Sequence, residues 1–126
     1  MDKKLVLWVD DLREPPNRPG EVYMIANSVN EAKRAIEESE RSSWSEHWEN
    51  GVCVEKLQCI DIIDLDHDAG DYFADGGDYI NILNYLEARA HQGYEVKCAF
   101  RIHSFNTVGY VNMKAIIEHN KWRLLG

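Results

Sequence analysis

The sequence predicts one α/β domain built on a central, mostly parallel sheet of five strands, with helices on both faces. Two observations predict this fold class. Short apolar runs alternate with segments of helical periodicity after residue 57, and such alternation forms parallel sheets through right-handed crossovers. The first apolar run, residues 5–9, is uninterrupted, as is typical of a strand buried on both faces. The 126 residues contain no linker or repeat, so we expect a single domain over residues 1–126.

The first third of the chain predicts two strands and a helix. A proline-rich loop separates the strand at residues 5–9 from a short strand at residues 22–26. Ser28 and Glu31 have the spacing of a capping box, in which the serine accepts from a free backbone N–H and the glutamate reaches back. We expect the helix that they begin to end near Glu40.

Residues 41–56 are predicted to be an insertion between this helix and the third strand. A short helix here would place Trp44, His47 and Trp48 on one side. The tryptophans are expected to form a packing stripe, although at a pocket rim they could stack a nucleobase. This insertion is also the surface through which a protein partner is expected to bind, if there is one.

The rest of the chain shows the clearest alternation. We predict strands at residues 57–65 and 96–102, and helices at residues 78–92 and 109–120. Residues 122–125 are predicted to form a fifth, terminal strand.

The balance of charge restricts the partners that the protein can bind. With 22 acidic and 14 basic side chains, the formal net charge is −8. Such a surface repels the phosphate backbone, which argues against binding to a long nucleic acid duplex. A small phosphorylated ligand, or the terminus of an RNA, can still bind if cations in the pocket make the local electrostatic potential positive.

The chain also lacks the marks of a membrane or secreted protein. No apolar run approaches the roughly 20 residues that span a bilayer, and the N-terminal residues do not resemble a signal peptide. The cysteines, Cys53, Cys59 and Cys98, are odd in number and have no C-x-x-C spacing. We therefore expect free, structural thiols and a cytoplasmic location.

Polar, ionisable residues follow three of the predicted strands directly. In open α/β sheets, ligands bind beyond the carboxyl ends of the strands, where such residues would converge. The three groups are Asp10, Asp11 and Arg13; Asp66, His67 and Asp68; and His103, Ser104 and Asn106.

The acidic members of these groups predict a divalent metal site. Asp10, Asp11 and Asp66, with Asp68 as a further candidate, would bring together carboxylates that cannot all stay charged without a cation. Oxygen ligands favour Mg²⁺ or Mn²⁺. Asp64, one pleat before Asp66, is expected to be buried and hydrogen-bonded behind the site.

The remaining members predict phosphate chemistry. His67 and His103 on neighbouring strand ends suit acid–base catalysis on a phosphodiester, with the order of the two roles left open. Arg13 can act as a bidentate phosphate clamp, and Ser104 and Asn106 as neutral hydrogen-bond donors.

This arrangement resembles the receiver domains of two-component signalling. The resemblance implies a flavodoxin- or receiver-like three-layer sandwich with the strand order 2-1-3-4-5. It implies that Asp10 and Asp11 bind Mg²⁺, that Asp66 accepts a phosphoryl group and that Ser104 is the switch hydroxyl. Receivers carry a lysine just after the fifth strand, whereas Lys121 precedes the predicted terminal strand and would lie at its other end.

The chain is more closely similar to cyclic-phosphate processing receiver domains. Three family motifs occur at residues 8–16, 65–70 and 103–109, and residues 77–86 resemble the family's Gly-Tyr-Asp-x-Leu-x-Trp-Leu helix. Thr107 stands where the family usually has proline. The resemblance implies a role in processing cyclic phosphates.

Together these observations predict a metal-dependent phosphoesterase that acts on a 2′,3′-cyclic RNA end or a small cyclic nucleotide. Asp66, His67 and His103 would be its catalytic residues. The alternatives are a receiver-like module that binds a cyclic nucleotide or a protein without turnover, and a degenerate phosphoreceiver.

Overall fold

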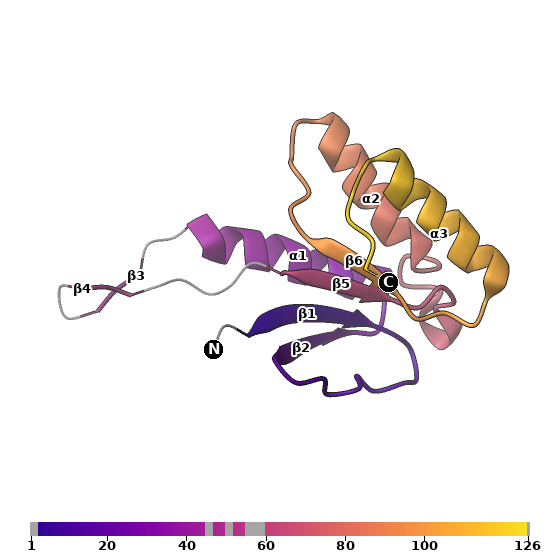
Figure 1. Ribbon diagram of the computed structural model, residues 1–126, viewed down its shortest axis with the longest axis horizontal. Coiled ribbons are helices and arrows are strands. Elements are labelled where there is room, and N and C mark those ends of the chain that lie inside the picture. The colour runs from indigo at the N-terminus through magenta and orange to yellow at the C-terminus, as the bar shows by residue number, and fades with distance from the viewer. Residues whose placement is uncertain (1–2, 45–46, 50–51, 55–59, 126) are drawn as a thin grey trace.

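The computed structural model describes residues 3–44, 47–49, 52–54 and 60–125, with side chains for residues 3–40 and 60–125. Its central element is a four-stranded parallel sheet in the order β2-β1-β5-β6 (Figure 1). The strands are β1 (Lys4–Val9), β2 (Glu21–Ala26), β5 (Ile62–Leu65) and β6 (Ala99–Ile102). The receiver-like α/β class and the predicted order of the first four sheet strands are therefore confirmed.

Among the described residues, two α-helices and a short 3₁₀-helix lie between these strands, and a third α-helix follows β6. They are α1 (Val29–Trp44), η1 (Gly70–Tyr72), α2 (Ile80–His91) and α3 (Thr107–His119). The predicted capping box is present, because the Ser28 hydroxyl accepts from the Glu31 N–H at 3.0 Å. The Glu31 carboxylate accepts from the Asn27 N–H at 2.7 Å. The helix that begins here continues past Glu40, where we expected it to end.

The prediction of a short helix around Trp44, His47 and Trp48 is wrong. After α1 the chain forms two strands, β3 (His47–Glu49) and β4 (Val52–Val54), which pair antiparallel in a separate two-stranded sheet. Two β-branched valines in β4 favour a strand over a helix. The expected roles of the two tryptophan side chains lie outside the described residues.

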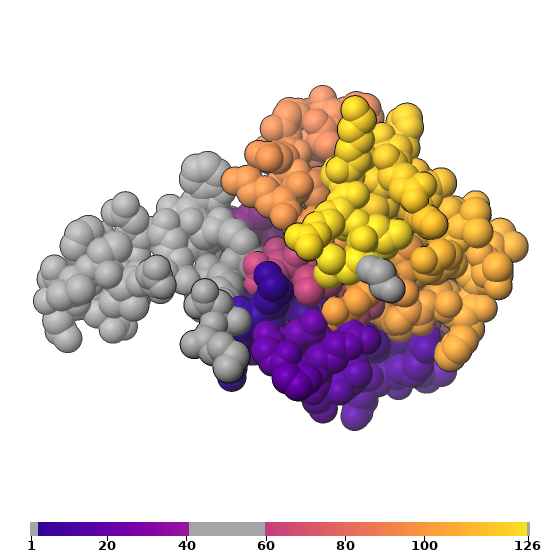
Figure 2. All heavy atoms as spheres, in the orientation of Figure 1, coloured from indigo at the N-terminus to yellow at the C-terminus, as the bar shows by residue number. Residues whose placement is uncertain are grey.

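The prediction of a fifth strand is also wrong for the part of the chain that the structure describes. Residues 122–125 pair with β6 only around Phe100, through a single parallel bridge to Leu124. The Phe100 N–H donates to Arg123 and its carbonyl accepts from Leu125. The Trp122 ring stacks on Phe100, with 5.3 Å between centroids, so packing as well as pairing holds this segment. In Figure 2 these last residues, in yellow, lie at the surface above residues 3–26 in indigo and violet.

The helices cover one face of the sheet, so the described residues form two layers and not the expected three. One hydrophobic cluster includes residues of all three helices and the strand residues of a single face, namely Leu7, Val9, Ala26, Ile63, Leu65 and Phe100. Val6, Trp8 and Ile62 alternate with these residues along the strands, point to the opposite face and are outside the cluster.

The direction of the connections explains this one-sided arrangement. The connections that contain α1, α2 and α3 all step across the sheet in the same direction, from β2 towards β6 (Figure 1). Right-handed crossovers that step in one direction place their helices on one face. The connection from β1 to β2, residues 10–20, steps the other way and contains no helix.

The parallel register brings the ends of β1, β5 and β6 to one edge. The Asp66 N–H donates to Val9 at 3.0 Å, and the His103 N–H donates to Leu65 at 2.9 Å. Residues 10–13, 66–68 and 103–106 therefore follow three hydrogen-bonded strands and lie next to one another.

Two further features concern the described free cysteine and the character of the helices. Burial raises the pKa of the Cys98 thiol to about 12, so this free cysteine is unreactive, as expected of a structural thiol. The side chains of Cys53 and Cys59 lie outside the described residues. Among the helices of the described residues, none has the length and apolar character to cross a membrane.

Candidate functional site

Three carboxylates meet where β1 and β5 end. Asp10, Asp11 and Asp66 each have an oxygen atom within 4.8 Å of an oxygen of the other two. These are three of the four residues that we predicted as metal ligands. An all-oxygen donor set of this kind suits a hard divalent cation.

Asp10 is buried, with 2% of the residue exposed, and its carboxylate is fully hydrogen-bonded. Oδ1 accepts from the backbone N–H groups of Leu12 and Arg13 at 2.9 and 3.0 Å. Oδ2 faces Arg13 Nε at 3.1 Å and His103 Nε2 at 2.9 Å. Burial alone would raise the pKa of Asp10, but these four partners hold that pKa below its ordinary value.

Asp11 has the opposite electrostatic setting. Burial raises its pKa, and the negative charges of Asp10 and Asp66 raise it further. Its carboxylate lies directly over Gly70, where an added Cβ would be 2.2 Å from Oδ2. Gly70 also has a φ of +55°, which side chains rarely adopt. The glycine in the Leu-Asp-His-Asp-x-Gly motif is thus required for Asp11 to approach Asp66.

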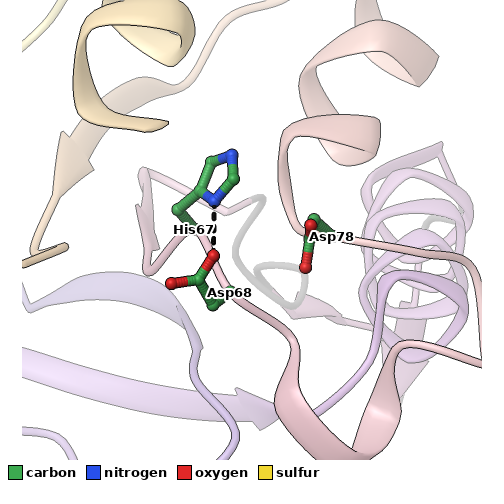
Figure 3. A group of neighbouring side chains, drawn as sticks. All are labelled: His67, Asp68 and Asp78. Carbon is green, nitrogen blue, oxygen red and sulfur yellow. Dashed lines mark hydrogen bonds and ion pairs between the residues drawn. The ribbon is translucent and has the colours of Figure 1, made fainter. Parts of the chain in front are cut away.

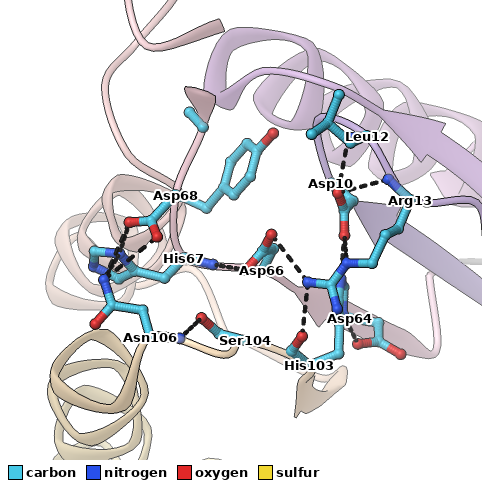
Figure 4. Close-up of polar contacts among 12 residues, drawn as sticks. Asp10, Leu12, Arg13, Asp64, Asp66, His67, Asp68, His103, Ser104 and Asn106 are labelled. Carbon is cyan, nitrogen blue, oxygen red and sulfur yellow. Dashed lines mark hydrogen bonds and ion pairs between the residues drawn. The ribbon is translucent and has the colours of Figure 1, made fainter. Parts of the chain in front are cut away.

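Arg13 joins the three loops (Figure 4). Its guanidinium is 3.1 Å from Asp66 Oδ2 through Nη2 and 3.1 Å from Asp10 Oδ2 through Nε. Nη2 also donates to the His103 carbonyl at 3.0 Å. The predicted phosphate clamp therefore lies inside the acidic group and supplies part of its countercharge.

His103 is held on three sides. Nδ1 is 2.5 Å from Asp64 Oδ1 and Nε2 is 2.9 Å from Asp10 Oδ2. The ring stacks on Trp8, with 3.9 Å between centroids and 4° between planes. Because each nitrogen faces a carboxylate oxygen, the ring satisfies both contacts only by donating from both.

Behind His103 lies a connected group of charged side chains, which we call the charged ladder: Asp64, Arg101, Glu21 and Arg18. The last three of these residues were not selected from the sequence. The fully buried Asp64 accepts from Arg101 Nε at 2.6 Å and lies 3.6 Å from Arg18 Nη1. The Arg101 guanidinium also donates to both oxygens of Glu21, at 2.9 and 3.0 Å. Hydrogen bonding from Arg101 lowers the pKa of Glu21, and the same contact is the largest cause of a raised pKa at Arg101.

One signal could have revealed this ladder. Asp64 and Arg101 are opposite charges inside two apolar strands, and they are direct partners in the register of β5 and β6. The expectation that Asp64 is buried and hydrogen-bonded behind the site agrees with these contacts.

His67 and Asp68 belong to a second group of possible ligands, with Asp78 (Figure 3). His67 Nδ1 is 2.8 Å from Asp68 Oδ1, and Asp78 Oδ1 accepts from the Ala69 N–H at 3.1 Å. The contact with His67 lowers the pKa of Asp68. Asp68, predicted as a ligand beside Asp10, is thus placed in a different group, and the sequence reasoning did not select Asp78.

Asn106 and Gly109 fix the position of His67. Asn106 is the N-cap of α3, since its Oδ1 accepts from the Gly109 N–H at 2.9 Å. Its Nδ2 donates to Asp68 Oδ1 at 3.2 Å. The His67 ring lies against Gly109, where an added Cβ would be 2.3 Å from its Cγ.

Ser104 accepts from the Asn106 N–H at 3.0 Å and so shapes the loop before α3. In Figure 4, Asp66 lies between His67 and His103, and the His67 ring is turned towards Asp68 and Asn106. The structure therefore brings all nine predicted site residues to one edge of the sheet, in two adjoining groups.

Comparison with known proteins agrees with this geometry. The family model described as "Cyclic-phosphate processing Receiver domain" matches residues 5–119, which include every residue of the site. No curated protein and no solved structure matches the chain. The chain belongs to the family of cyclic-phosphate processing receiver domains.

Proposed function

We propose that this protein is a metal-dependent phosphoesterase that hydrolyses a cyclic phosphate, either a 2′,3′-cyclic RNA end or a small cyclic nucleotide. The observation that carries the proposal is the meeting of Asp10, Asp11 and Asp66 at one strand edge, with a histidine on each side. A phosphodiester hydrolase needs countercharge for the phosphate and two groups that move protons.

The acidic residues fit a divalent cation. Asp10, Asp11 and Asp66 would hold Mg²⁺ or Mn²⁺. Burial and, to a lesser degree, the charges of Asp10 and Asp66 raise the pKa of Asp11, and a cation would relieve that repulsion. When bound, such an ion stabilises developing charge on a phosphoryl oxygen.

Arg13 is the residue of the chain best placed to bind the phosphate. Its side chain is 39% exposed and already lies among the carboxylates, so a small rotation turns its paired N–H groups towards a ligand. In doing so, Arg13 exchanges a carboxylate partner for the phosphate of the ligand. Ser104 and Asn106 would complete the contacts to phosphate oxygens.

The hydrogen bonds suggest how the two histidines divide the proton transfers. The His67 tautomer that donates from Nδ1 to Asp68, 2.8 Å away, would leave the lone pair on Nε2 to take a proton from water. The water oxygen then bonds to phosphorus, and one ring P–O bond breaks. His103, which donates from both nitrogens, would give its Nε2 proton to the departing alkoxide, so that the product is a phosphate monoester.

The direct test is turnover of nucleoside 2′,3′-cyclic phosphates in the presence of Mg²⁺ or Mn²⁺, followed by detection of the monophosphate. The double variant H67A/H103A should lose at least 100-fold in kcat, since each proton transfer contributes on the order of 10²-fold or more. A matched control is H91A/H119A, which removes two exposed histidines at the ends of α2 and α3. Full activity of H67A/H103A would reject the acid–base pair.

One observation favours a second candidate, a module that binds a cyclic nucleotide without turnover. The Asp10 carboxylate is already hydrogen-bonded by the protein's own Leu12, Arg13 and His103, so the site carries its own countercharge. This candidate predicts that a cyclic nucleotide raises the melting temperature although no product forms.

A further inference from the structure

The loop between β6 and α3 presents an exposed aromatic side chain at the site. Phe105 is 89% exposed, although phenylalanine is ordinarily a core residue. It stands between Ser104 and Asn106, two residues that belong to the site. A single exposed apolar side chain is common on protein surfaces, and what distinguishes this ring is its position between two residues of the site.

The exposure of Phe105 is not the result of a loosely held loop. Arg13 Nη2 donates to the carbonyl of His103 at 3.0 Å, two residues before the ring. The Asn106 N–H donates to Ser104 Oγ at 3.0 Å, and Asn106 caps α3. The backbone on both sides of Phe105 is therefore anchored, and the ring is held outward.

The Arg13 side chain links the Phe105 ring to the carboxylates of Asp10 and Asp66. The Arg13 guanidinium carbon lies 4.8 Å from the Phe105 centroid, in a cation–π contact. The same guanidinium pairs with Asp10 and Asp66. A ligand whose phosphate contacts Arg13 therefore has its organic part within reach of Phe105.

We infer that Phe105 is a stacking platform for the nucleobase of the ligand, which makes a nucleoside cyclic phosphate, and not a base-free cyclic phosphate, the preferred class. The inference rests on the proposed function. A nucleoside cyclic phosphate joins an anionic group and a flat π-surface through one ribose, which matches the neighbouring cation and exposed ring. Stacking is tolerant of base identity, so we expect similar affinity for purine and pyrimidine ligands.

The experiment compares two ligands, adenosine 2′,3′-cyclic phosphate and glycerol 1,2-cyclic phosphate, on the full chain with Mg²⁺. Dissociation constants are measured by calorimetry, and product formation is measured in parallel. The variants are F105A, which removes the platform, and F105W, which keeps it. Tyr94→Ala is the matched control, because Tyr94 is 57% exposed but precedes β6 and lies at its other end. Since Phe105 is at the surface, thermal melting should show that all variants fold.

We expect F105A to bind the adenosine ligand about 5- to 150-fold more weakly, the fold-change that corresponds to one base stack. Glycerol cyclic phosphate should bind F105A and wild type equally, and F105W and Y94A should bind both ligands like wild type. Unchanged adenosine binding by F105A would overturn the inference and would leave Phe105 as a contact for a protein partner.

The outcomes separate this inference from the proposed function. Base-dependent binding that F105A removes, without any product, supports the platform and rejects the hydrolase. Turnover with equal kcat/KM for the two ligands supports the hydrolase and rejects the platform. Failure of wild type to bind either ligand rejects both.

Discussion

The two faces of the sheet are formed by the same strands, but one face is apolar and the other carries charged side chains. On the helix-covered face, Leu7, Ile63 and Leu65 belong to one apolar cluster with α1, α2 and α3. On the other face, Asp64 and Arg101 form part of a charged ladder that ends at His103 and Asp10. The first face stabilises the domain, and the second also positions the site.

This difference follows from the period of two along a strand. In β5, Ile63 and Leu65 point to the helices, whereas Ile62 and Asp64 point to the opposite face. A buried charge is tolerated only when it is paired and hydrogen-bonded, and Asp64 is paired with Arg101, Arg18 and His103. Asp64, on the face without helices, therefore helps to fix the direction in which the His103 imidazole points.

The largest effect is expected for D64N on the charged face. This variant removes one of the two carboxylates that Arg101 and His103 each face, leaving Glu21 beside Arg101 and Asp10 beside His103. Breaking a buried pair costs about 3–5 kcal/mol. Urea denaturation measures the free energy of unfolding, and calorimetry measures ligand affinity. Both should fall. D68N, at a carboxylate whose side chain is 62% exposed, is the control for stability and should lose little. A D64N protein as stable as wild type would contradict the role given to the ladder.

The matched change on the apolar face is L65A. Leu65 is fully buried, and its truncation should lower the free energy of unfolding by about 2–5 kcal/mol. At a temperature where the variant stays folded, its affinity for a cyclic nucleotide should remain that of wild type. A large loss of affinity in L65A, measured by the same calorimetry, would show that the two faces are not separable.

A smaller effect on stability is expected for G109A, at the contact between α3 and His67. Alanine favours the helix by about 1 kcal/mol, but its Cβ would overlap the His67 ring and so cost about 1–3 kcal/mol. The net loss of stability should therefore be at most about 2 kcal/mol, whereas the displaced His67 should lower turnover at least tenfold. V111A, at an exposed position of the same helix, is the control. Turnover in G109A equal to that of wild type would mean that the His67 position is not needed.

The neighbouring carboxylates Asp10 and Asp11 have opposite pKa shifts, and the smallest effect on stability is expected for D11N. The pKa of Asp10 is lowered from 3.8, so its charge stabilises the fold above that pH, and the contribution is lost as pH falls through the lower folded value. The pKa of Asp11 is raised from 3.8, so its charge opposes folding above that pH. At pH 7, D10N should therefore lower the melting temperature and D11N should raise it slightly, and both differences should narrow in acid.

The same pair of variants tests the metal site. Mg²⁺ should raise the melting temperature of wild type at pH 7. The rise should be lost in D11N, because this variant lacks one metal ligand and also the charge repulsion among the carboxylates that the cation would relieve. Identical Mg²⁺-dependent shifts in wild type, D10N and D11N would place the cation elsewhere.

The parts of the fold that local sequence controls were predictable. The Ser28–Glu31 capping box and β1 occur where the pattern predicted them. The strands β5 and β6 end at the predicted residues but are shorter, because they begin at Ile62 and Ala99. The short helix predicted to place Trp44, His47 and Trp48 on one side was wrong because a few aromatic residues at helical spacing do not outweigh the β-preference of the valines in β4. The fifth strand was wrong because residues 122–125 pair only around Phe100.

For the site, the sequence by itself determined which loops meet, because polar residues that directly follow neighbouring parallel strands converge at one edge. It also determined the chemical types present there, namely carboxylates, imidazoles and a guanidinium. Only the tertiary structure decided that Arg101 supports Asp64, that Asp64 and Asp10 hold His103, and that Asp68 lies with His67 and Asp78. The physical reason is that strand register and crossover direction, which select these partners, depend on packing between segments far apart in the chain.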